Sequence, residues 1–292
     1  MKITIIGGGG RVGSTAAFSM MINNLASEVV LIDISEDRAK GEALDLAHSI
    51  SGMKIDAEVY GGSDYSLTEN SDIIIVTAGV TRKPDMNRLE LAESNIGIVR
   101  DVTKRALEYS KNPFVLIVSN PVDVLTYNTI KLSNLEPSRV IGLGTLLDTV
   151  RLKSLLKLMF NIEYSEEVMI IGEHGDSMTP VFSHLGADAP ISKLRNVFEE
   201  VRVSAGKVIE AKGGTWFAPA TAISEVVRGL QNKESTIMPI SVYLENHGIC
   251  IGYPSEVSSS GVRPVNYNLS REEEELFLKS VDRIRTAINK NL

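Results

Sequence analysis

The sequence contains a single cysteine, Cys250, among its 292 residues, and it contains no run of 18 or more apolar residues. One cysteine excludes an intrachain disulfide framework and is typical of a reducing compartment. Without a long apolar run, a membrane-spanning helix is not expected. The first apolar segment, residues 3–6, meets glycine too soon to form the core of a signal peptide. We therefore expect a cytoplasmic protein in which Cys250 is a core residue.

Positive charge is also scarce. The chain has 30 lysines and arginines against 37 aspartates and glutamates, which gives a net charge of −7. A negative balance argues against nucleic acid or an anionic membrane as the main partner. An anionic ligand must therefore be attracted by local arginines, against the overall field.

Short apolar segments alternate with longer amphipathic segments through the first half of the chain. The apolar segments are rich in valine and isoleucine, which is typical of buried parallel strands. They are Lys2–Ile6, Glu28–Asp33, Ser71–Ala78, Pro113–Ser119 and Arg139–Leu143, with a weaker candidate at Ala57–Tyr60. Helical spacing is found between them, at Arg11–Leu25, Glu36–His48, Arg88–Ser110 and Val122–Leu132. This alternation predicts an α/β fold with a doubly wound parallel sheet.

The pattern changes near residue 145, where strict alternation ends. Helices are expected at Asp148–Phe160, Leu194–Ala211, Pro219–Leu230 and Ser270–Asn289, and strands at Glu167–Ile171, Ser241–Leu244 and Gly248–Tyr253. The acidic run Glu272–Glu275 opens the last helix, where negative charge suits the dipole, and it is interpreted as a solvated face. We expect two tightly packed domains, residues 1–145 and an α+β domain over residues 146–292.

A glycine-rich motif follows the first expected strand. Gly8, Gly10 and Gly13 form G-x-G-x-x-G at the start of a helix, and Asp33 ends the second strand about 20 residues later. The motif alone could be a flexible turn, but this context is typical of a Rossmann-type dinucleotide site, with the pyrophosphate at the helix N-terminus. An aspartate at this position accepts hydrogen bonds from the ribose hydroxyls and repels a 2′-phosphate, which favours NAD over NADP.

Polar side chains suited to an acidic substrate follow the strand at residues 71–78. Arg82 and Arg88 lie six residues apart, and Arg151 follows Asp148 on a later helix. Arginine grips carboxylates well, because its planar fork of N–H donors matches two oxygens. His174 could be a structural histidine and Asp148–Arg151 a solvated ion pair, but a histidine oriented by a carboxylate is also the base that alcohol oxidation requires. The set predicts redox chemistry on a small dicarboxylic acid.

Six ordered motifs resemble those of the lactate/malate dehydrogenases, most strongly the lactate-dehydrogenase-like malate dehydrogenases of archaea and bacteria. They are Gly8-Gly9-Gly10-Arg11-Val12-Gly13, Val76-Thr77-Ala78-Gly79, Arg82-Lys83-Pro84 through Arg88, Ser119-Asn120-Pro121-Val122-Asp123, Leu147-Asp148-Thr149-Val150-Arg151, and Gly172-Glu173-His174-Gly175-Asp176-Ser177. The resemblance runs from residue 2 to the last helix. It implies an NAD-binding first domain, a substrate-binding second domain and no metal.

The resemblance also implies roles for individual residues. His174 is expected to be the proton acceptor, oriented by Asp148, while Arg151 holds the C1 carboxylate of the substrate and Arg88 polarises the C2 oxygen. The implied substrate-binding residues are Arg82, Arg88, Asn120, Arg151 and Thr215. The implied cofactor-binding residues are Gly8, Gly10, Arg11, Val12, Gly13, Asp33, Thr77, Ala78, Gly79, Asn95, Val118 and Asn120.

Arg82 bears on the identity of the substrate. In the family, arginine at this position accompanies oxaloacetate and glutamine accompanies pyruvate. A second carboxylate sealed from water needs a matching positive charge. Met86 points the same way, because lactate enzymes usually have an acidic residue there. Asp85, where most relatives have glycine, puts the efficiency of loop closure in doubt.

Other functions stay open at this point. Residues 144–149 look more like the lactate branch, so lactate or another 2-hydroxyacid is the second candidate. An NAD- and metal-dependent glycosidase scaffold and a non-catalytic NAD-binding module are further alternatives, which the set Asp148, Arg151 and His174 disfavours. The resemblance also implies a homodimer or homotetramer and a place in the tricarboxylic acid cycle.

Overall fold

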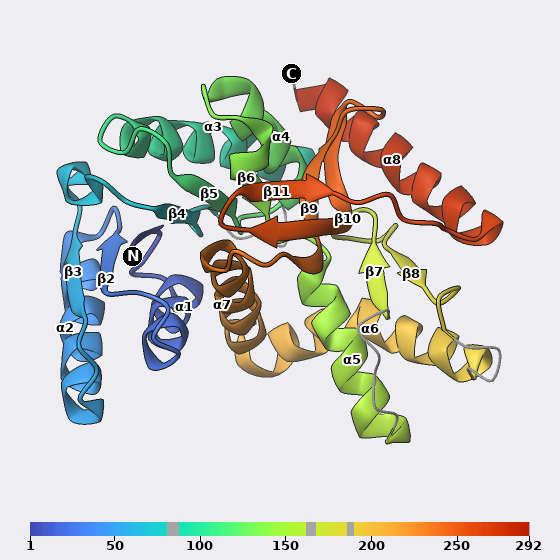
Figure 1. Ribbon diagram of the computed structural model, residues 1–292, viewed down its shortest axis with the longest axis horizontal. Coiled ribbons are helices and arrows are strands. Elements are labelled where there is room, and N and C mark those ends of the chain that lie inside the picture. The colour runs from blue at the N-terminus through green and yellow to red at the C-terminus, as the bar shows by residue number, and fades with distance from the viewer. Residues whose placement is uncertain (81–87, 162–167, 186–189, 292) are drawn as a thin grey trace.

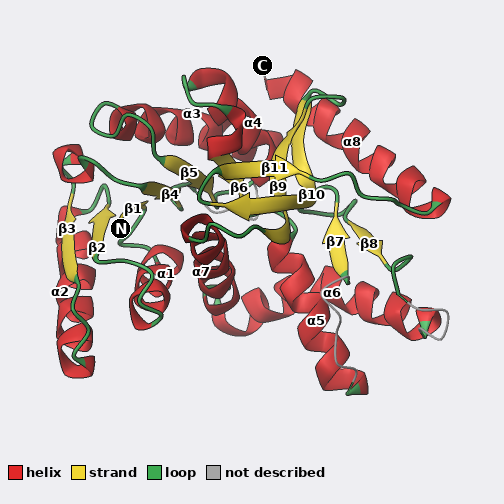
Figure 2. Ribbon diagram, viewed as in Figure 1, coloured by secondary structure: helices red, strands yellow, loops and turns green. Residues whose placement is uncertain are grey.

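The computed structural model describes residues 1–80, 88–161, 168–185 and 190–291. Its centre is a nine-stranded sheet with the order β11-β10-β9-β6-β5-β4-β1-β2-β3, with helices packed on both faces (Figure 1). Figure 2 shows the same arrangement by type of element, with the sheet running across the middle of the molecule.

The parallel part of the sheet is the Rossmann-type unit, with strands in the order β3-β2-β1-β4-β5-β6. Its strands are β1 (Lys2–Ile6), β2 (Glu28–Ile32), β3 (Glu58–Gly62), β4 (Ile73–Val76), β5 (Phe114–Ile117) and β6 (Val140–Gly142). All four residues of β4 and of β5 are buried, because helices cover both faces of these central strands. The predicted fold class is confirmed.

The helices of the first half connect these strands. They are α1 (Arg11–Ile22), α2 (Glu36–Met53), α3 (Arg88–Leu107) and α4 (Val122–Leu132), with the 3₁₀ turns η1 (Tyr65–Thr68) and η2 (Pro137–Arg139). In the view of Figure 1, α3 and α4 lie above the sheet and α1 lies below it. Because strands β1 to β6 are parallel, their carboxyl ends lie at the same edge of the sheet, where ligands bind in folds of this kind.

The second half extends the same sheet. Its antiparallel strands are β9 (Thr236–Leu244), β10 (Ile249–Ser258) and β11 (Gly261–Pro264), and a separate hairpin is formed by β7 (Met169–Ile171) and β8 (Thr179–Val181). Ser241 of β9 pairs with Gly142 of β6, so the sheet is continuous from one half to the other. The helices are α5 (Leu146–Phe160), α6 (Ile191–Lys212), α7 (Phe217–Gln231) and α8 (Arg271–Asn291).

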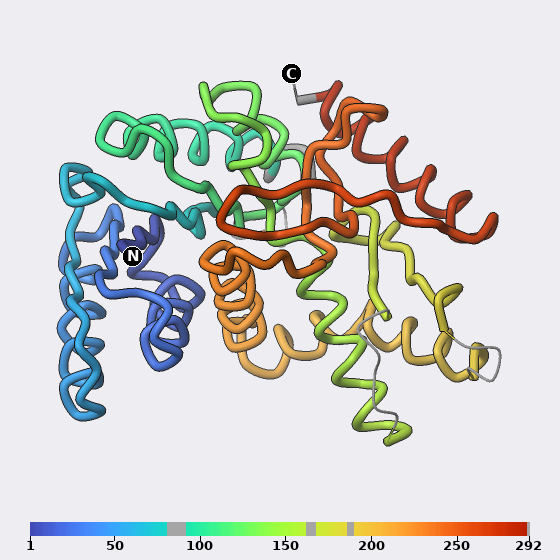
Figure 3. Tube along the Cα trace, in the orientation of Figure 1, coloured from blue at the N-terminus to red at the C-terminus, as the bar shows by residue number. Residues whose placement is uncertain are grey.

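Segments far apart in sequence pack together across the two halves. Helix α7 packs against α1, and the last helix, α8, packs against α3 and α4, as the tube in Figure 3 makes visible. Cys250 is fully buried in β10, which confirms that it is a core residue. Among the described helices, none has the length and apolar character that crossing a bilayer requires.

Two strands were not predicted. Strand β8 has three residues with a proline in the middle, and β11 follows a serine-rich turn with two of its four residues exposed. Both are too short and too polar to show a hydrophobic period, so their pairing partners define them. The interpretation of Glu272–Glu275 as a solvated face is wrong for Glu273, which is 7% exposed.

Candidate active site

The nucleotide loop lies between β1 and α1, and its glycines are required by close contacts. A Cβ on Gly8 would lie 2.7 Å from the Cβ of Leu31, and one on Gly13 would lie 2.6 Å from the Gly7 carbonyl oxygen. A Cβ on Gly10 would have only the Gly7 carbonyl oxygen within 4 Å, at 3.2 Å. The space beside Gly10 is otherwise open to a ligand. The loop thus fits a pyrophosphate at the N-terminus of α1.

The tight turn is made by Gly7, one residue before the first glycine of the G-x-G-x-x-G motif. Gly7 has a φ of +88°, while Gly8 has no positive φ. A Cβ on Gly7 would also lie 2.6 Å from the Ala78 backbone nitrogen. Four consecutive glycines conceal which of them makes the turn, so sequence spacing alone could not assign it.

Asp33 lies directly after β2, beside this loop. Its Oδ2 accepts a hydrogen bond from the Gly9 N–H at 3.0 Å, and its Oδ1 accepts one from the Ser35 N–H at 3.0 Å. The two backbone donors fix the carboxylate where ribose hydroxyls can reach it. Arg38, which was not predicted at the site, also lies beside the loop: a Cβ on Gly9 would lie 3.2 Å from the Arg38 Cβ.

The segments after β4 and β5 form the opposite wall of the nucleotide loop. Thr77 donates to the Ile6 and Gly7 carbonyl oxygens, at 3.1 and 3.2 Å. Asn95 is buried and donates to the Asn120 carbonyl oxygen at 2.7 Å, while its Oδ1 accepts from the Val80 N–H at 2.8 Å. Asn95 therefore acts as a structural cross-link between the two loops.

The remaining residues expected at this wall are placed beside it. A Cβ on Gly79 would lie 3.1 Å from the Asn95 Oδ1, and Ala78 accepts a hydrogen bond from the Ser119 hydroxyl at 2.6 Å. In the segment after β5, Val118 is half-buried and Asn120 is exposed. Val12 is half-buried in the first turn of α1.

His174, Asp148 and Arg151 form one hydrogen-bonded group. His174 Nδ1 lies 2.6 Å from Asp148 Oδ2, and Arg151 Nη1 lies 3.1 Å from Asp148 Oδ1. An ionised carboxylate only accepts, so Nδ1 carries the proton and Nε2 of the neutral ring has the lone pair. The Asp148 side chain is 2% exposed, whereas those of His174 and Arg151 are 18% and 15% exposed. The structure thus brings together the predicted base, its orienting carboxylate and one predicted substrate ligand.

The charge state of His174 depends on opposing effects. Burial disfavours the imidazolium, but the charge of Asp148 and its hydrogen bond outweigh burial, so the pKa of His174 is raised. Arg151 opposes this rise more weakly. A base with a raised pKa can hold its proton near neutral pH.

The loop that carries His174 is fixed by α8. Glu173 Oε2 accepts from the Ser177 N–H at 3.1 Å and forms an ion pair with Arg283 Nε at 3.1 Å. Ser280 accepts from the Glu173 N–H at 3.2 Å. Gly172 begins the loop with a φ of +91°, and a Cβ there would meet the Ser280 hydroxyl at 2.6 Å. The contacts with α8 were not predicted, because residues more than 100 positions apart in sequence give no local signal.

A cavity of about 520 Å³ opens beside this group. His174, Arg151 and Asp148 line it, together with Met178 and residues of α6 such as Arg202. Arg202 is held by the Glu199 carboxylate at 3.1 Å and contacts the Asp176 carbonyl oxygen at 3.4 Å. The cavity is large enough for a small hydroxy acid, and His174 and Arg151 present polar groups to it.

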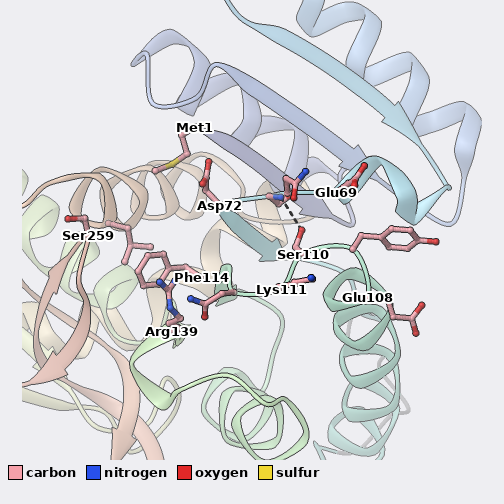
Figure 4. A pocket seen from close by; sticks show the side chains of 14 residues that line it. Met1, Glu69, Asp72, Glu108, Ser110, Lys111, Phe114, Arg139 and Ser259 are labelled. Atoms are coloured by element: carbon pink, nitrogen blue, oxygen red, sulfur yellow. Dashed lines mark hydrogen bonds between the residues drawn. The ribbon is translucent and has the colours of Figure 1, made fainter.

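A larger cavity, of about 750 Å³, lies elsewhere (Figure 4). Its wall includes Met1, Asp72, Phe114 and Arg139, which stand at the amino ends of β1, β4, β5 and β6. This is the edge of the sheet opposite to the nucleotide loop. The larger cavity is therefore distinct from the candidate active site.

Thr215 lies in the loop between α6 and α7 and is half-buried. It is absent from the wall of the 520 Å³ cavity. Two cations lie over the ring of its neighbour Trp216. The Arg11 Cζ is 4.8 Å and the Lys212 Nζ is 3.3 Å from the ring centre. The structure thus places the Thr215 loop against the N-terminus of α1.

Some predicted residues fall outside the part of the chain that the structure describes. Arg82, Asp85 and Met86 lie outside the described residues. Arg88 is the first residue of α3, and its side chain is not described. Within the described residues, no group of three or more histidine, cysteine, aspartate or glutamate side chains could hold a metal ion.

Comparisons with known proteins agree with this geometry. Residues 1–142 match the model of the lactate/malate dehydrogenase NAD-binding domain, and residues 145–292 match that of the lactate/malate dehydrogenase α/β C-terminal domain. The chain belongs to the lactate/malate dehydrogenase family. It is an oxidoreductase of the NAD-dependent lactate/malate dehydrogenase class, and NAD is its cofactor.

Members of both branches of the family are similar to this chain. Malate dehydrogenase from Archaeoglobus fulgidus is 39% identical over 289 residues, covering 98% of this chain and 97% of the relative. L-lactate dehydrogenase from Clostridium botulinum is 35% identical over 308 residues, covering 99% and 96%. The solved structure of the Archaeoglobus fulgidus malate dehydrogenase in complex with NADH has a TM-score of 0.93, 38% identity, and coverage of 100% of this chain and 99% of the other.

Proposed function

We propose that this chain is an NAD-dependent malate dehydrogenase that interconverts malate and oxaloacetate. One observation supports the dehydrogenase mechanism above all: the carboxylate of Asp148 is hydrogen-bonded to both His174 and Arg151. The choice of malate is supported by Arg82 in the sequence and by the similarity to an archaeal malate dehydrogenase.

The residues of the chain divide the work of the reaction between them. NAD supplies the hydride chemistry when bound, and the glycine loop and Asp33 would hold its pyrophosphate and ribose. In malate oxidation, neutral His174 takes the hydroxyl proton at Nε2 while Asp148 holds the ring by Nδ1. Asp148 then stabilises the imidazolium that forms. Arg151 presents its other N–H groups to the C1 carboxylate, and its position is fixed by the same Asp148.

The remaining roles follow from the resemblance; of these residues, Arg82 and Arg88 have side chains that are not described. We assign the second carboxylate of the substrate to Arg82 and the polarisation of its C2 oxygen to Arg88. Asn120 and Thr215 are assigned to the substrate as the resemblance implies, with Asn120 near the reacting oxygen.

We also propose that the chain divides into an NAD-binding domain, residues 1–145, and a substrate domain, residues 146–292. This division is supported by the ends of two elements, because β6 ends at Gly142 and α5 begins at Leu146.

The second candidate, L-lactate dehydrogenase, is favoured by one observation. The lactate dehydrogenase from Clostridium botulinum matches 99% of this chain at 35% identity, nearly as well as the malate enzyme. The two candidates share the group of His174, Asp148 and Arg151, and differ in what the residue at position 82 must contact.

The proposed proton transfer is tested by measuring kcat/KM against pH in both directions. Reduction needs protonated His174 and should fall as pH rises, whereas oxidation needs the neutral ring and should fall as pH drops. H174Q should lower both rates by roughly a thousandfold or more. Parallel pH profiles in the two directions, or an active H174Q variant, would count against His174 as the proton-transfer group.

A further inference from the structure

Asp123 is a buried carboxylate that the reaction described above does not use. It is the second residue of α4 and is 2% exposed. Its Oδ2 accepts a hydrogen bond from the His174 backbone N–H at 3.0 Å, and its Oδ1 accepts one from the Ser241 hydroxyl at 2.6 Å. One side chain thus joins a helix of the first half, the loop that carries His174, and strand β9.

The position of Ser241 leaves Asp123 little freedom. Ser241 pairs with Gly142 where the parallel and antiparallel parts of the sheet meet. A Cβ on Gly142 would lie 2.8 Å from the Ser241 Cβ, and one on Gly144 would lie 2.7 Å from the Ser241 nitrogen. Close packing at this junction fixes the backbone and Cβ of Ser241, which places its hydroxyl beside the Asp123 carboxylate.

Hydrogen bonding alone does not account for a charged residue here. A neutral asparagine could accept from the His174 N–H with its oxygen and donate to the Ser241 hydroxyl, which can rotate. Burying a carboxylate costs free energy that such an amide would avoid. A charge at this point is explained if it acts on a neighbouring charge, and His174 is the neighbouring group that gains a positive charge in the reaction.

We propose that Asp123 is a positioning residue for His174, which fixes the main chain of the histidine loop and serves as a second carboxylate that stabilises the imidazolium. This inference rests on the proposed role of His174 as the proton acceptor. It assigns the reaction a residue of α4, in the half of the chain that binds NAD.

Other charged or titratable groups near the pair must be counted with it. They are Asp148 and Arg151 of α5, Glu173 of the histidine loop, Cys250 of β10, and Glu199 and Arg202 of α6 across the cavity. Burial raises the pKa of Asp123 to about 6, against the hydrogen bonds from Ser241 and His174. The charge of Asp123 in turn helps to raise the pKa of His174. The charge state of each group therefore affects the pKa of the other.

The test compares D123N with wild type in two measurements. The first is the NMR titration of the His174 imidazole, which is assignable because the chain has four histidines and H174Q removes one signal. We expect the pKa of His174 to be lower in D123N. The second is the pH profile of kcat/KM, whose inflections should move to lower pH in both directions while the plateau falls by about tenfold.

Two further variants separate electrostatics from folding. S241A keeps the carboxylate but removes one of its donors, so it should shift the His174 titration in the same direction by less. D72N makes the same change of charge and size at the opposite edge of the sheet, where Asp72 accepts from the Lys2 N–H at 2.8 Å, and should leave the titration unchanged. If D123N does not fold, S241A decides.

The inference is overturned if His174 titrates at the wild-type pH in D123N and S241A, even when their rates fall. Failure of the proposed function gives a different result, because wild-type rates would then not follow the NMR titration of His174, or H174Q would be active. The NMR shift does not depend on activity, so the two failures are distinguishable.

Discussion

Asp148 determines the geometry of the site at the scale of single residues. Its two oxygens hold one nitrogen of His174 and one of Arg151, so a single side chain orients both the base and a substrate ligand. The sequence predicted this group, because three residue types with a known chemical relation occur in one ordered set of motifs. It did not predict Asp123 or Glu173, since a carboxylate that serves a backbone N–H looks like any other acidic residue in a sequence.

Arg82 is the residue on which substrate choice is expected to depend. We predict that R82Q lowers the ratio of kcat/KM for oxaloacetate to that for pyruvate by about a hundredfold or more, because the second carboxylate loses its counter-charge. The measurement is the steady-state rate of NADH oxidation with each acid. Lys83→Gln removes one positive charge from the adjacent position and is the matched control.

An unchanged ratio of the two kcat/KM values in R82Q would show that Arg82 does not determine substrate specificity. If R82Q and Lys83→Gln lowered kcat/KM equally for both acids, the loss of a positive charge in general, rather than the loss of Arg82 in particular, would explain the effect.

At the scale of elements, helix α8 holds the second half together through its first turn. Glu273 and Ser270 form a capping box: Glu273 Oε2 accepts from the Ser270 N–H at 2.9 Å, and the Ser270 hydroxyl accepts from the Glu273 N–H at 3.4 Å. Glu273 Oε1 also accepts from the N–H groups of Phe182 and Ser183, at 2.7 and 2.9 Å. The cap signal S-x-x-E was present in the sequence, but the segment after β8 that it also satisfies was not predictable.

We predict that Glu273→Ala lowers the free energy of unfolding by about 2 to 4 kcal/mol, because several backbone N–H groups lose a charged acceptor. Glu274→Ala, at an exposed position on the same turn, should change it by less than about 0.5 kcal/mol. Urea denaturation followed by circular dichroism measures both. Equal effects from the two substitutions would show that the helix dipole, rather than the cap, is responsible.

The strands differ in how well their own residues predict them. The buried strands of the first half were predicted from continuous apolar segments rich in valine and isoleucine, and the helices between them from their amphipathic period. Strands β8 and β11 are defined by their partners rather than by their own residues. The bridge from Gly142 to Ser241, which makes one sheet of the two halves, joins residues 99 positions apart and leaves no local pattern.

At the scale of the whole molecule, the site is assembled from both halves of the chain, and its buried charges affect stability. The pKa of Asp123 is raised from an ordinary value of 3.8 to about 6, and that of His174 is raised above 6.5. Both groups bind protons more tightly in the folded state. Their contribution to stability is therefore present at low pH; that of Asp123 is lost as pH rises from 3.8 through about 6, and that of His174 as pH rises above 6.5 through its folded pKa.

We predict that D123N gains stability relative to wild type as the pH rises from 4 to 8, by about 3 kcal/mol, because it removes the cost of the buried charge. The measurement is the difference in free energy of unfolding between D123N and wild type at several pH values. A difference that does not vary with pH would mean that Asp123 has the same proton affinity in the folded and unfolded chain.

A homodimer or homotetramer and a place in the tricarboxylic acid cycle stay predictions from the resemblance. A cytoplasmic location stays a prediction from the single cysteine and the lack of a long apolar segment. The fold class, the family and the cofactor could be predicted from the sequence because each depends on several motifs at once. The choice between malate and lactate is expected to depend on Arg82, a single position, so the motifs that identify the family do not decide it.

The proposed malate dehydrogenase activity is tested most directly by the ratio of kcat/KM for oxaloacetate and pyruvate, measured with the purified protein and NADH. We expect a preference for oxaloacetate of at least about a hundredfold. A preference for pyruvate would contradict it, because the chain would then be a lactate dehydrogenase in which Arg82 does not bind the substrate.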